Sequence, residues 1–167
     1  MSVEAVRAYL DRWGRGKDVQ EKALSTATVL EAAAALGVLP ARIAKSISLK
    51  SPEGAIIVVA AGDTKLDNKK FKTQFGYKAS MLSPEDALRL TGHAIGGVCP
   101  FALPPDIKVY LDASLKRFDT IFPACGSSNS MIELTPAELE AYSNSAAWID
   151  VCQTVSRETN LGGRLIE

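Results

Sequence analysis

The fold class is decided by the stretch Arg42-Ile43-Ala44-Lys45-Ser46-Ile47-Ser48-Leu49-Lys50 and by the residues that follow it. Apolar residues alternate with small or charged ones in this stretch, which is typical of a β-strand with one buried face. The next residues, Ser51-Pro52-Glu53-Gly54, have the composition of a tight turn. The apolar run Ala55-Ile56-Ile57-Val58-Val59-Ala60 then predicts a buried strand. Together the three segments predict a β-hairpin.

Lys45 interrupts the apolar side of the first of these strands. It shares the odd-numbered side with Ile43, Ile47 and Leu49. An ammonium group in such a position costs desolvation free energy unless it meets an anion or reaches water. One interpretation is that Lys45 binds a phosphate or carboxylate at the mouth of a cleft. The other is that its side chain extends to solvent at the edge of the sheet, where lysine opposes aggregation.

The helices and strands expected outside the hairpin do not alternate regularly. Apolar spacing, capping residues and C-terminal glycines predict helices over residues 3–13, 28–37, 67–75, 83–92 and from 135 onward. Alternation predicts further strands over residues 107–111, 120–124, 131–134 and 147–151. This order disfavours a doubly wound parallel sheet. We expect a mixed α/β (α+β) fold, in which one strongly curved mixed sheet or barrel-like core is surrounded by helices.

Length and overall charge exclude several classes of protein. The 167 residues fit one domain, to which we assign residues 1–155, and we expect the polar residues 156–167 to form a frayed tail. Nineteen Lys and Arg residues balance nineteen Asp and Glu residues, which excludes a globally basic nucleic-acid-binding protein. A hydrophobic content of 47% excludes a charged, disordered chain.

One segment is nevertheless locally basic. Only Asp67 opposes its lysines, which are Lys65, Lys69, Lys70, Lys72 and Lys78. Such a run usually forms a solvated helix face. The alternative is a patch that meets phosphates and is extended by Arg42, Lys45 and Lys50. The balanced overall charge therefore excludes broad wrapping of a nucleic acid but leaves a focused contact with one end of it open.

Cysteine, histidine and hydropathy argue against a metal site and against membrane association. The three cysteines, Cys99, Cys125 and Cys152, lie far apart without a CxxC motif, and His93 is the single histidine. We therefore expect reduced thiols, no metal and no cofactor. The N-terminus lacks the apolar run of a signal peptide. The longest apolar run, residues 55–61, is too short to cross a bilayer, so we expect a cytoplasmic protein.

Two loops carry residues suited to chemistry. The first, His93-Ala94-Ile95-Gly96-Gly97-Val98-Cys99-Pro100-Phe101, has adjacent glycines that allow a backbone to approach a ligand closely. Its N–H groups can then bind a carbonyl oxygen or a phosphate, although a plain tight loop has the same composition. A thiol nucleophile at Cys99 would need His93 as its base, and nothing else in the sequence supports that pair.

The second loop, Gly126-Ser127-Ser128-Asn129-Ser130, joins two predicted strands. It lacks the final glycine of a nucleophile elbow, and a strand follows it where an elbow would have a helix. Its residue types suit a polar pocket wall that supplies hydroxyl and amide contacts. They suit an ordinary hairpin loop equally well.

Several short motifs occur in a specific order along the chain. Residues 32–37 with Pro40 match a pattern EAAxxLGVxP, Ile43-Ala44-Lys45-Ser46 matches IAK[ST], residues 62–67 match GDxxLD, and residues 91–101 match TG…GGxxPF. In this order the motifs resemble the YbaK/prolyl-tRNA synthetase editing-domain family. The similarity spans residues 25–142, and each motif is weak alone while the order and spacing of the set are specific.

The resemblance implies a YbaK-like fold and an aminoacyl-tRNA deacylase that needs no metal or cofactor. In its terms Lys45 holds the terminal phosphate or the nearby backbone of the substrate. Gly96, Gly97 and Pro100 belong to a GxxxP loop, whose backbone N–H groups stabilise the developing oxyanion. The ribose 2′-hydroxyl orients the attacking water. Cys99 occupies a variable position of the loop, so the resemblance gives a thiol nucleophile no support.

The expected substrate is the acceptor end of a mischarged tRNA, with tRNA-Pro carrying Ala, Ser, Thr or Cys as the first choice. An aminoacyl-tRNA synthetase is a further candidate partner. The alternative is a module without catalysis, which binds an amino acid or nucleotide or recruits a synthetase. The residues that we expect to contact the substrate are Ser25, Thr26, Ser46, Cys99, Asp112, Gly126, Ser127, Ser128 and Asn129.

Overall fold

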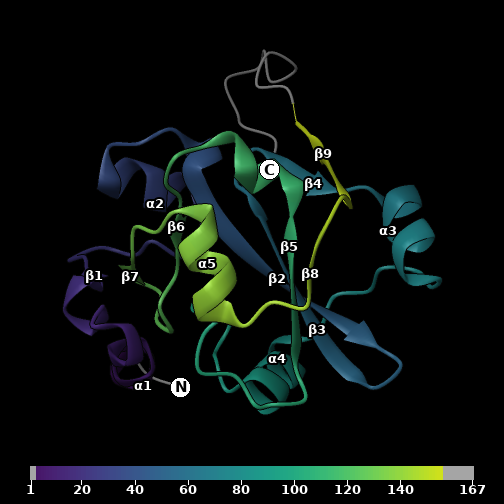
Figure 1. Cartoon of the computed structure of the whole chain (residues 1–167), viewed down its shortest axis with the longest axis horizontal. Helices are drawn as coiled ribbons and strands as arrows, with labels where there is room; N and C mark the ends of the chain where they lie inside the picture. Colours follow the sequence, from purple (N-terminus) through teal and green to yellow (C-terminus); the bar gives the residue numbers. More distant parts are fainter. Residues whose placement is uncertain (1–2, 156–167) are drawn as a thin grey trace.

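A five-stranded mixed sheet forms the centre of the computed structural model, which describes residues 3–155 (Figure 1). Its strands, in spatial order, are β6 (Phe122–Pro123), β2 (Ile43–Ser51), β3 (Gly54–Ala61), β5 (Lys108–Asp112) and β8 (Ala147–Ile149). Only β2 and β3 pair antiparallel, as the predicted hairpin, and the other three pairings are parallel. The sheet curls strongly into a half-barrel, which confirms the predicted fold class.

The hairpin carries the core because β3 is apolar on both faces. Its odd-numbered residues, such as Ile57 and Val59, pack into the larger cluster of buried side chains with Leu10 of α1. Its even-numbered residues, such as Val58, pack into a second cluster around Phe71 of α3. A continuous apolar run is the pattern expected of a strand covered on both sides.

Five α-helices surround the sheet within the described residues. Their bounds are α1 (Val3–Leu10), α2 (Val29–Leu36), α3 (Asn68–Phe75), α4 (Pro84–Thr91) and α5 (Pro136–Ser143). The capping signals of the sequence act as predicted: Thr28 and Thr135 each form a capping box, and Ser83 caps α4. In Figure 1, α2 and α3 lie on opposite sides of the central sheet. The predicted tail, residues 156–167, lies outside the described residues.

Short strands differ most from the prediction. The segments predicted as strands over 120–124 and 131–134 shrink to β6 and to β7 (Ser130–Met131), which pairs with β1 (Gln20–Glu21) in a separate two-stranded sheet. A third sheet joins β4 (Thr64–Leu66) to β9 (Cys152–Thr154). Elements of two or three residues are too short to show a periodic pattern, so β1, β4 and β9 were not predicted.

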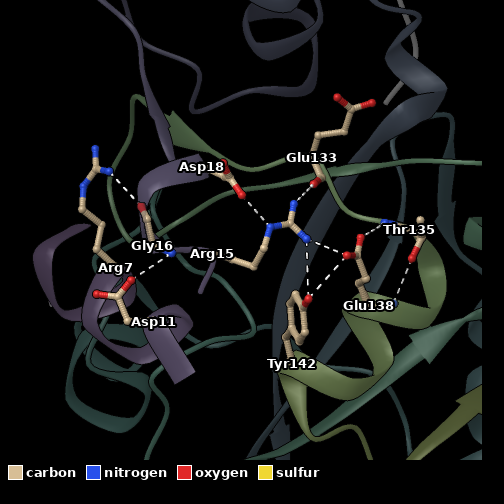
Figure 2. Close-up of polar contacts among 9 residues, drawn as sticks. All are labelled: Arg7, Asp11, Arg15, Gly16, Asp18, Glu133, Thr135, Glu138 and Tyr142. Atoms are coloured by element: carbon tan, nitrogen blue, oxygen red, sulfur yellow. Dashed lines mark hydrogen bonds and ion pairs between the residues drawn. The ribbon is translucent and has the colours of Figure 1, made fainter. Parts of the chain in front are cut away.

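An ion-pair cluster fixes the segment between α1 and β1 against α5 (Figure 2). The Arg15 guanidinium lies 2.6 Å from both the Asp18 and the Glu138 carboxylates, and it also donates to the Glu133 carbonyl oxygen. Figure 2 shows these side chains converging from the N-terminal segment and from α5. The cluster therefore helps to place β1 and the residues after it, which reach the candidate site.

Within residues 3–155 no helix is both long enough and apolar enough to span a lipid bilayer.

Candidate functional site

A cavity of about 140 Å³ opens at the edge of β2. It forms there because β6 pairs with β2 only at Ile43 and Ala44, so that the next residues of β2 lack a neighbouring strand on that side. The wall is completed by the start of α2, the loop before α4, the loop of residues 93–101 (the glycine loop) and the strand β6. The lining residues are Thr26, Ala27, Thr28, Val29, Ala32, Ile43, Ala44, Lys45, Ser46, Ser48, Met81, Ile95, Gly96, Val98, Phe122, Ala124 and Met131.

Lys45 carries the only positive charge among the described residues that line this cavity. Its side chain is half-buried, and the ammonium group donates a hydrogen bond to the carbonyl oxygen of Thr64 in β4. The Thr64 hydroxyl in turn donates to the carbonyl oxygen of Ala61, at 2.7 Å. The lysine therefore compensates its desolvation through a backbone oxygen of the neighbouring turn.

A bidentate ion pair holds the turn that contains Thr64. The Asp63 carboxylate accepts two hydrogen bonds from the Arg117 guanidinium, at 2.6 and 3.0 Å, which is the strong, planar geometry of this pair. The Asp63 carbonyl oxygen also accepts the Val155 amide at 2.7 Å. The position of the carbonyl group that holds Lys45 is thus fixed from both sides of the turn.

Ser46 presents an unsatisfied hydroxyl group at the cavity. Its Oγ is buried and has no hydrogen-bond partner within the part of the chain that the structure describes. A buried hydroxyl without a partner is unfavourable in the empty protein. Its presence in the cavity lining makes Ser46 a ready donor or acceptor for a bound polar group.

The glycine loop packs directly on the second predicted loop, backbone against backbone. A Cβ atom added to Gly97 would lie 2.9 Å from backbone atoms of Gly126 and Ser127. Gly96 adopts a positive φ of 91°, a conformation that glycine reaches without strain. The sequence therefore predicted two separate loops correctly, and the structure joins them into one wall.

The backbone amides of the glycine loop are used differently. The Gly97 amide donates to the Ala94 carbonyl oxygen at 2.9 Å, so it closes a turn. Among residues 3–155 the amides of Gly96 and Val98 have no protein acceptor, and both residues line the cavity. The same holds for Ile95, and of these unpaired donors we consider Gly96 and Val98 below.

Hydrogen bonds tie the second loop, residues 126–130 (the serine-rich loop), to the segment before α2. The Ser128 carbonyl oxygen accepts the Thr26 amide at 2.6 Å, and the hydroxyl of Ser25 approaches the same oxygen at 3.4 Å. The Asn129 side chain donates to the Lys22 carbonyl oxygen at 2.9 Å. Of these residues only Thr26 lines the cavity, while the others support the wall from behind.

Comparison with known proteins identifies the family. The sequence profile described as the aminoacyl-tRNA editing domain matches residues 24–142. The chain belongs to this family. The resemblance inferred from the short motifs is thereby confirmed.

Two curated relatives and one solved structure are similar to this editing domain. The "Uncharacterized protein YwhH" of Bacillus subtilis (strain 168) is 56% identical over 154 residues, covering 92% of this chain and 98% of the relative. The "Putative Cys-tRNA(Pro)/Cys-tRNA(Cys) deacylase EbsC" of Enterococcus faecalis (strain ATCC 700802 / V583) is 29% identical, covering 74% and 75%. A "putative trans-editing enzyme for prolyl tRNA synthetase" is 31% identical with a TM-score of 0.81, covering 90% and 96%.

Cys99 does not line the cavity of the editing domain. It is fully buried, and its Sγ lies 3.5 Å from Nε2 of His93. Burial raises the pKa of the Cys99 thiol to about 12, so the thiol stays protonated at neutral pH and is a poor nucleophile. The expectation that Cys99 contacts the substrate does not agree with this position.

Pro100 and Asp112 also lie away from the cavity. Pro100 lines a second cavity of about 380 Å³ together with Tyr9 and Trp13. Asp112 is buried, and its two carboxylate oxygens accept the amides of Ser114 and Val151, at 3.0 and 2.9 Å. Its hydrogen-bonding capacity serves the fold, and it does not line the cavity. Both residues were named because of their place in a motif, which does not specify the side on which the cavity forms.

Most lysines of the basic run belong to one helix. Lys69, Lys70 and Lys72 belong to α3, which lies across the sheet from α2 in Figure 1, and none of them lines the cavity. Lys70 pairs with Asp150 at 3.1 Å and donates to the Cys152 carbonyl oxygen. None of these three lysines lines the cavity with Lys45, whereas Lys65 directly follows Thr64, whose carbonyl oxygen holds the Lys45 ammonium group. Among the described residues no group of three or more His, Cys, Asp or Glu side chains is placed to hold a metal ion.

Exposed apolar residues at the cavity were missed by sequence reasoning. Met81 and Ile95 line the cavity and are 63% and 56% exposed. Met81 lies in the segment before α4, where a bridge to Leu49 brings it to β2. The only available signal was a large apolar residue in a predicted loop, which is common on protein surfaces.

Proposed function

We propose that this editing domain is a trans-editing aminoacyl-tRNA deacylase, which hydrolyses the ester bond between a wrong amino acid and the terminal adenosine of a tRNA. The observation that carries the proposal is that Lys45, Ser46, Gly96 and Val98 all line one small cavity. The Ser46 hydroxyl and the amides of Gly96 and Val98 have no hydrogen-bond partner within the described residues. Membership of the editing-domain family supports the assignment of a deacylase.

The chemistry asked of the site is modest because an aminoacyl ester is already activated. Water attacks the carbonyl carbon, and negative charge develops on the carbonyl oxygen of the tetrahedral intermediate. The amides of Gly96 and Val98 donate to this oxygen, and such preorganised donors stabilise the transition state more than the ground state. The 2′-hydroxyl of the terminal ribose orients the water, and the C–O bond to the ribose then breaks.

Lys45 anchors the 3′ end of the tRNA. An ammonium group has three N–H donors, so Lys45 can bind a phosphate oxygen while it keeps its hydrogen bond to Thr64. The turn held by Asp63 and Arg117 fixes the direction of the lysine. This places the ester against the glycine loop and replaces a bimolecular encounter by a fixed geometry.

The size and lining of the cavity favour a small aminoacyl group. The cavity has a volume of about 140 Å³, and a rigid pocket rejects excess size more sharply than a missing methyl group. Val29, Phe122 and Met131 give it an apolar wall, with Ser46 as the polar contact. We therefore propose Ala, Ser, Thr or Cys on tRNA-Pro as substrates. The name of EbsC supports Cys on tRNA-Pro, and that of the trans-editing enzyme supports a link to prolyl-tRNA synthetase.

A deacylation panel tests the proposal. Purified protein is incubated with tRNA-Pro charged with Pro, Ala, Ser, Thr or Cys, and with correctly charged tRNAs, and the loss of each ester is followed. We expect hydrolysis of at least one mischarged species and its loss in Lys45→Ala. The matched control is Lys69→Ala, which removes a lysine of α3 outside the cavity.

Two outcomes contradict the proposal. Stabilisation by an amino acid or a nucleotide without hydrolysis of any ester indicates a binding module. Binding of a synthetase that is equally strong in the wild type and in Lys45→Ala, again without hydrolysis, indicates a recruiting module.

A further inference from the structure

One buried imidazole closes the glycine loop at its base. His93 follows α4 directly and is fully buried, and the loop that it opens returns to it at Phe101. Nε2 of His93 lies 2.8 Å from the Phe101 carbonyl oxygen. The seven residues between these two positions include Gly96 and Val98, which line the cavity.

The backbone of His93 is fixed as firmly as its ring. The His93 amide donates to the Thr91 hydroxyl at 3.1 Å, and this hydroxyl donates to the Ala87 carbonyl oxygen at 2.6 Å. Thr91 is the last residue of α4 and is fully buried. The imidazole thus links the end of a helix to the far end of the loop.

The hydrogen bond to Phe101 determines the protonation of the ring. A carbonyl oxygen only accepts, so the proton lies on Nε2, and Nδ1 is left unprotonated. Nδ1 is buried without a hydrogen-bond partner within the described part of the chain. Burial also lowers the pKa of His93. His93 is therefore a neutral donor whose ring does not line the cavity, and it is placed for holding the loop.

We propose that His93 is the positioning residue of the deacylation reaction: its Nε2–H···O=C bond to Phe101 fixes the width of the glycine loop and so the place of the Gly96 and Val98 amides. The inference rests on the proposed function. Gly97 packs on the backbone of Gly126 and Ser127, so the loop has a rigid wall on one side. Opening its base moves the two amides away from the position of the oxyanion.

The kinetic test compares two replacements of the same ring. His93→Gln keeps an N–H donor near the position of Nε2, whereas His93→Leu keeps apolar volume and removes the donor. We expect His93→Leu to lower kcat for the hydrolysed mischarged tRNA by about tenfold or more, with KM within about twofold, because displaced donors affect the transition state. His93→Gln should recover most of that loss.

Phe71→Leu serves as the stability control. Phe71 is fully buried in the second cluster, on α3, so its replacement weakens packing without touching the loop. It should lower the melting temperature and leave kcat unchanged. A merely structural role for His93 predicts the same behaviour for His93→Leu.

Hydrogen exchange measures the loop without relying on activity. In folded His93→Leu the amides of residues 94–101 should exchange about tenfold faster than in the wild type, while those of β2 and β3 keep their protection. Phe71→Leu should not show this local change. Unchanged exchange in His93→Leu, or a His93→Gln variant that is as impaired as His93→Leu, overturns the proposal.

The two proposals fail in distinguishable ways. A wild-type protein that hydrolyses no mischarged tRNA refutes the deacylase function. The loop-closing role of His93 is then still decided by the exchange rates.

Discussion

Two lysine-bearing regions of this editing domain differ in almost every respect except charge. Lys45 is a single, half-buried lysine on β2, whose ammonium group is held by a backbone carbonyl beside a cavity. The lysines of α3 are more numerous, and none of them lines the cavity beside Lys45. A lysine that is desolvated and oriented has less entropy to lose on binding than an exposed one. Orientation, more than the number of charges, is therefore the reason for proposing Lys45 as the phosphate contact.

The largest effect is expected when Lys45 is removed, which tests directly whether it differs in function from the lysines of α3. We expect Lys45→Ala to lower kcat/KM for a mischarged tRNA by about 100-fold, because the ester is then no longer held against the glycine loop. Single-turnover deacylation measures the effect, and a thermal melt checks that the variant is folded. Activity within threefold of the wild type would show that Lys45 is not the anchor.

The glycine contact at the cavity gives the next largest effect. In Gly97→Ala the added Cβ would lie 2.9 Å from backbone atoms of Gly126 and Ser127, so the two loops must separate. We expect kcat to fall by about 30-fold with a small change in KM, because the loop donors act in the transition state. A steady-state titration with mischarged tRNA separates the two constants, and a change confined to KM would contradict this reason.

The Asp63–Arg117 and Lys70–Asp150 ion pairs provide a further test of this difference. Arg117→Gln removes the partner of Asp63 and frees the turn that holds Lys45, so we expect kcat/KM to fall by about tenfold. Lys70→Ala removes the Lys70–Asp150 pair on the α3 side and should change kcat/KM by less than about twofold. Equal effects of the two variants, measured in the same assay, would place Asp63 and Arg117 outside the positioning of Lys45.

The exposed apolar rim should contribute a smaller, binding-type effect. Met81 is 63% exposed beside the cavity, where it can cover part of the terminal nucleoside. We expect Met81→Ala to raise KM by about threefold and to leave kcat unchanged, since partial burial of an apolar side chain stabilises substrate and transition state alike. An exposed residue outside the cavity lining, Leu88, supplies the control as Leu88→Ala.

The smallest effect is expected on α3. The double variant Lys69→Ala/Lys72→Ala should change kcat/KM by less than about twofold, and the salt dependence of KM should keep its slope, because no phosphate contact is lost. Rates measured over a series of salt concentrations test this. A slope that falls by about two would show that α3 does contact the tRNA backbone.

The sequence allowed the hairpin and the helices to be predicted because their signals are local. Alternation before the turn, the apolar run after it, and the capping residues Thr28, Ser83 and Thr135 each act within a few residues. The motif that contains Lys45 and the motif that contains the glycine pair were also recognisable from sequence.

The composition of the cavity was not predictable in the same way. Met81, Phe122 and Met131 come from three separate elements, and only the folded sheet edge brings them together. Pro100 and Asp112 lie in or near conspicuous motifs, yet one faces another cavity and the other binds backbone amides. A short motif shows that a segment matters but not which side of its backbone faces the site.

The direct contact between Gly97 and the backbone of Gly126 and Ser127 separates two properties that many enzymes combine. No side chain lies between the two loops at this contact, so their spacing at this point is set by main-chain atoms. Substitutions among the surrounding apolar side chains can then alter which amino acid is accepted while the hydrolytic step is inherited unchanged. Descendants of one such scaffold would diverge in the error that they correct long before they lost the ability to correct one.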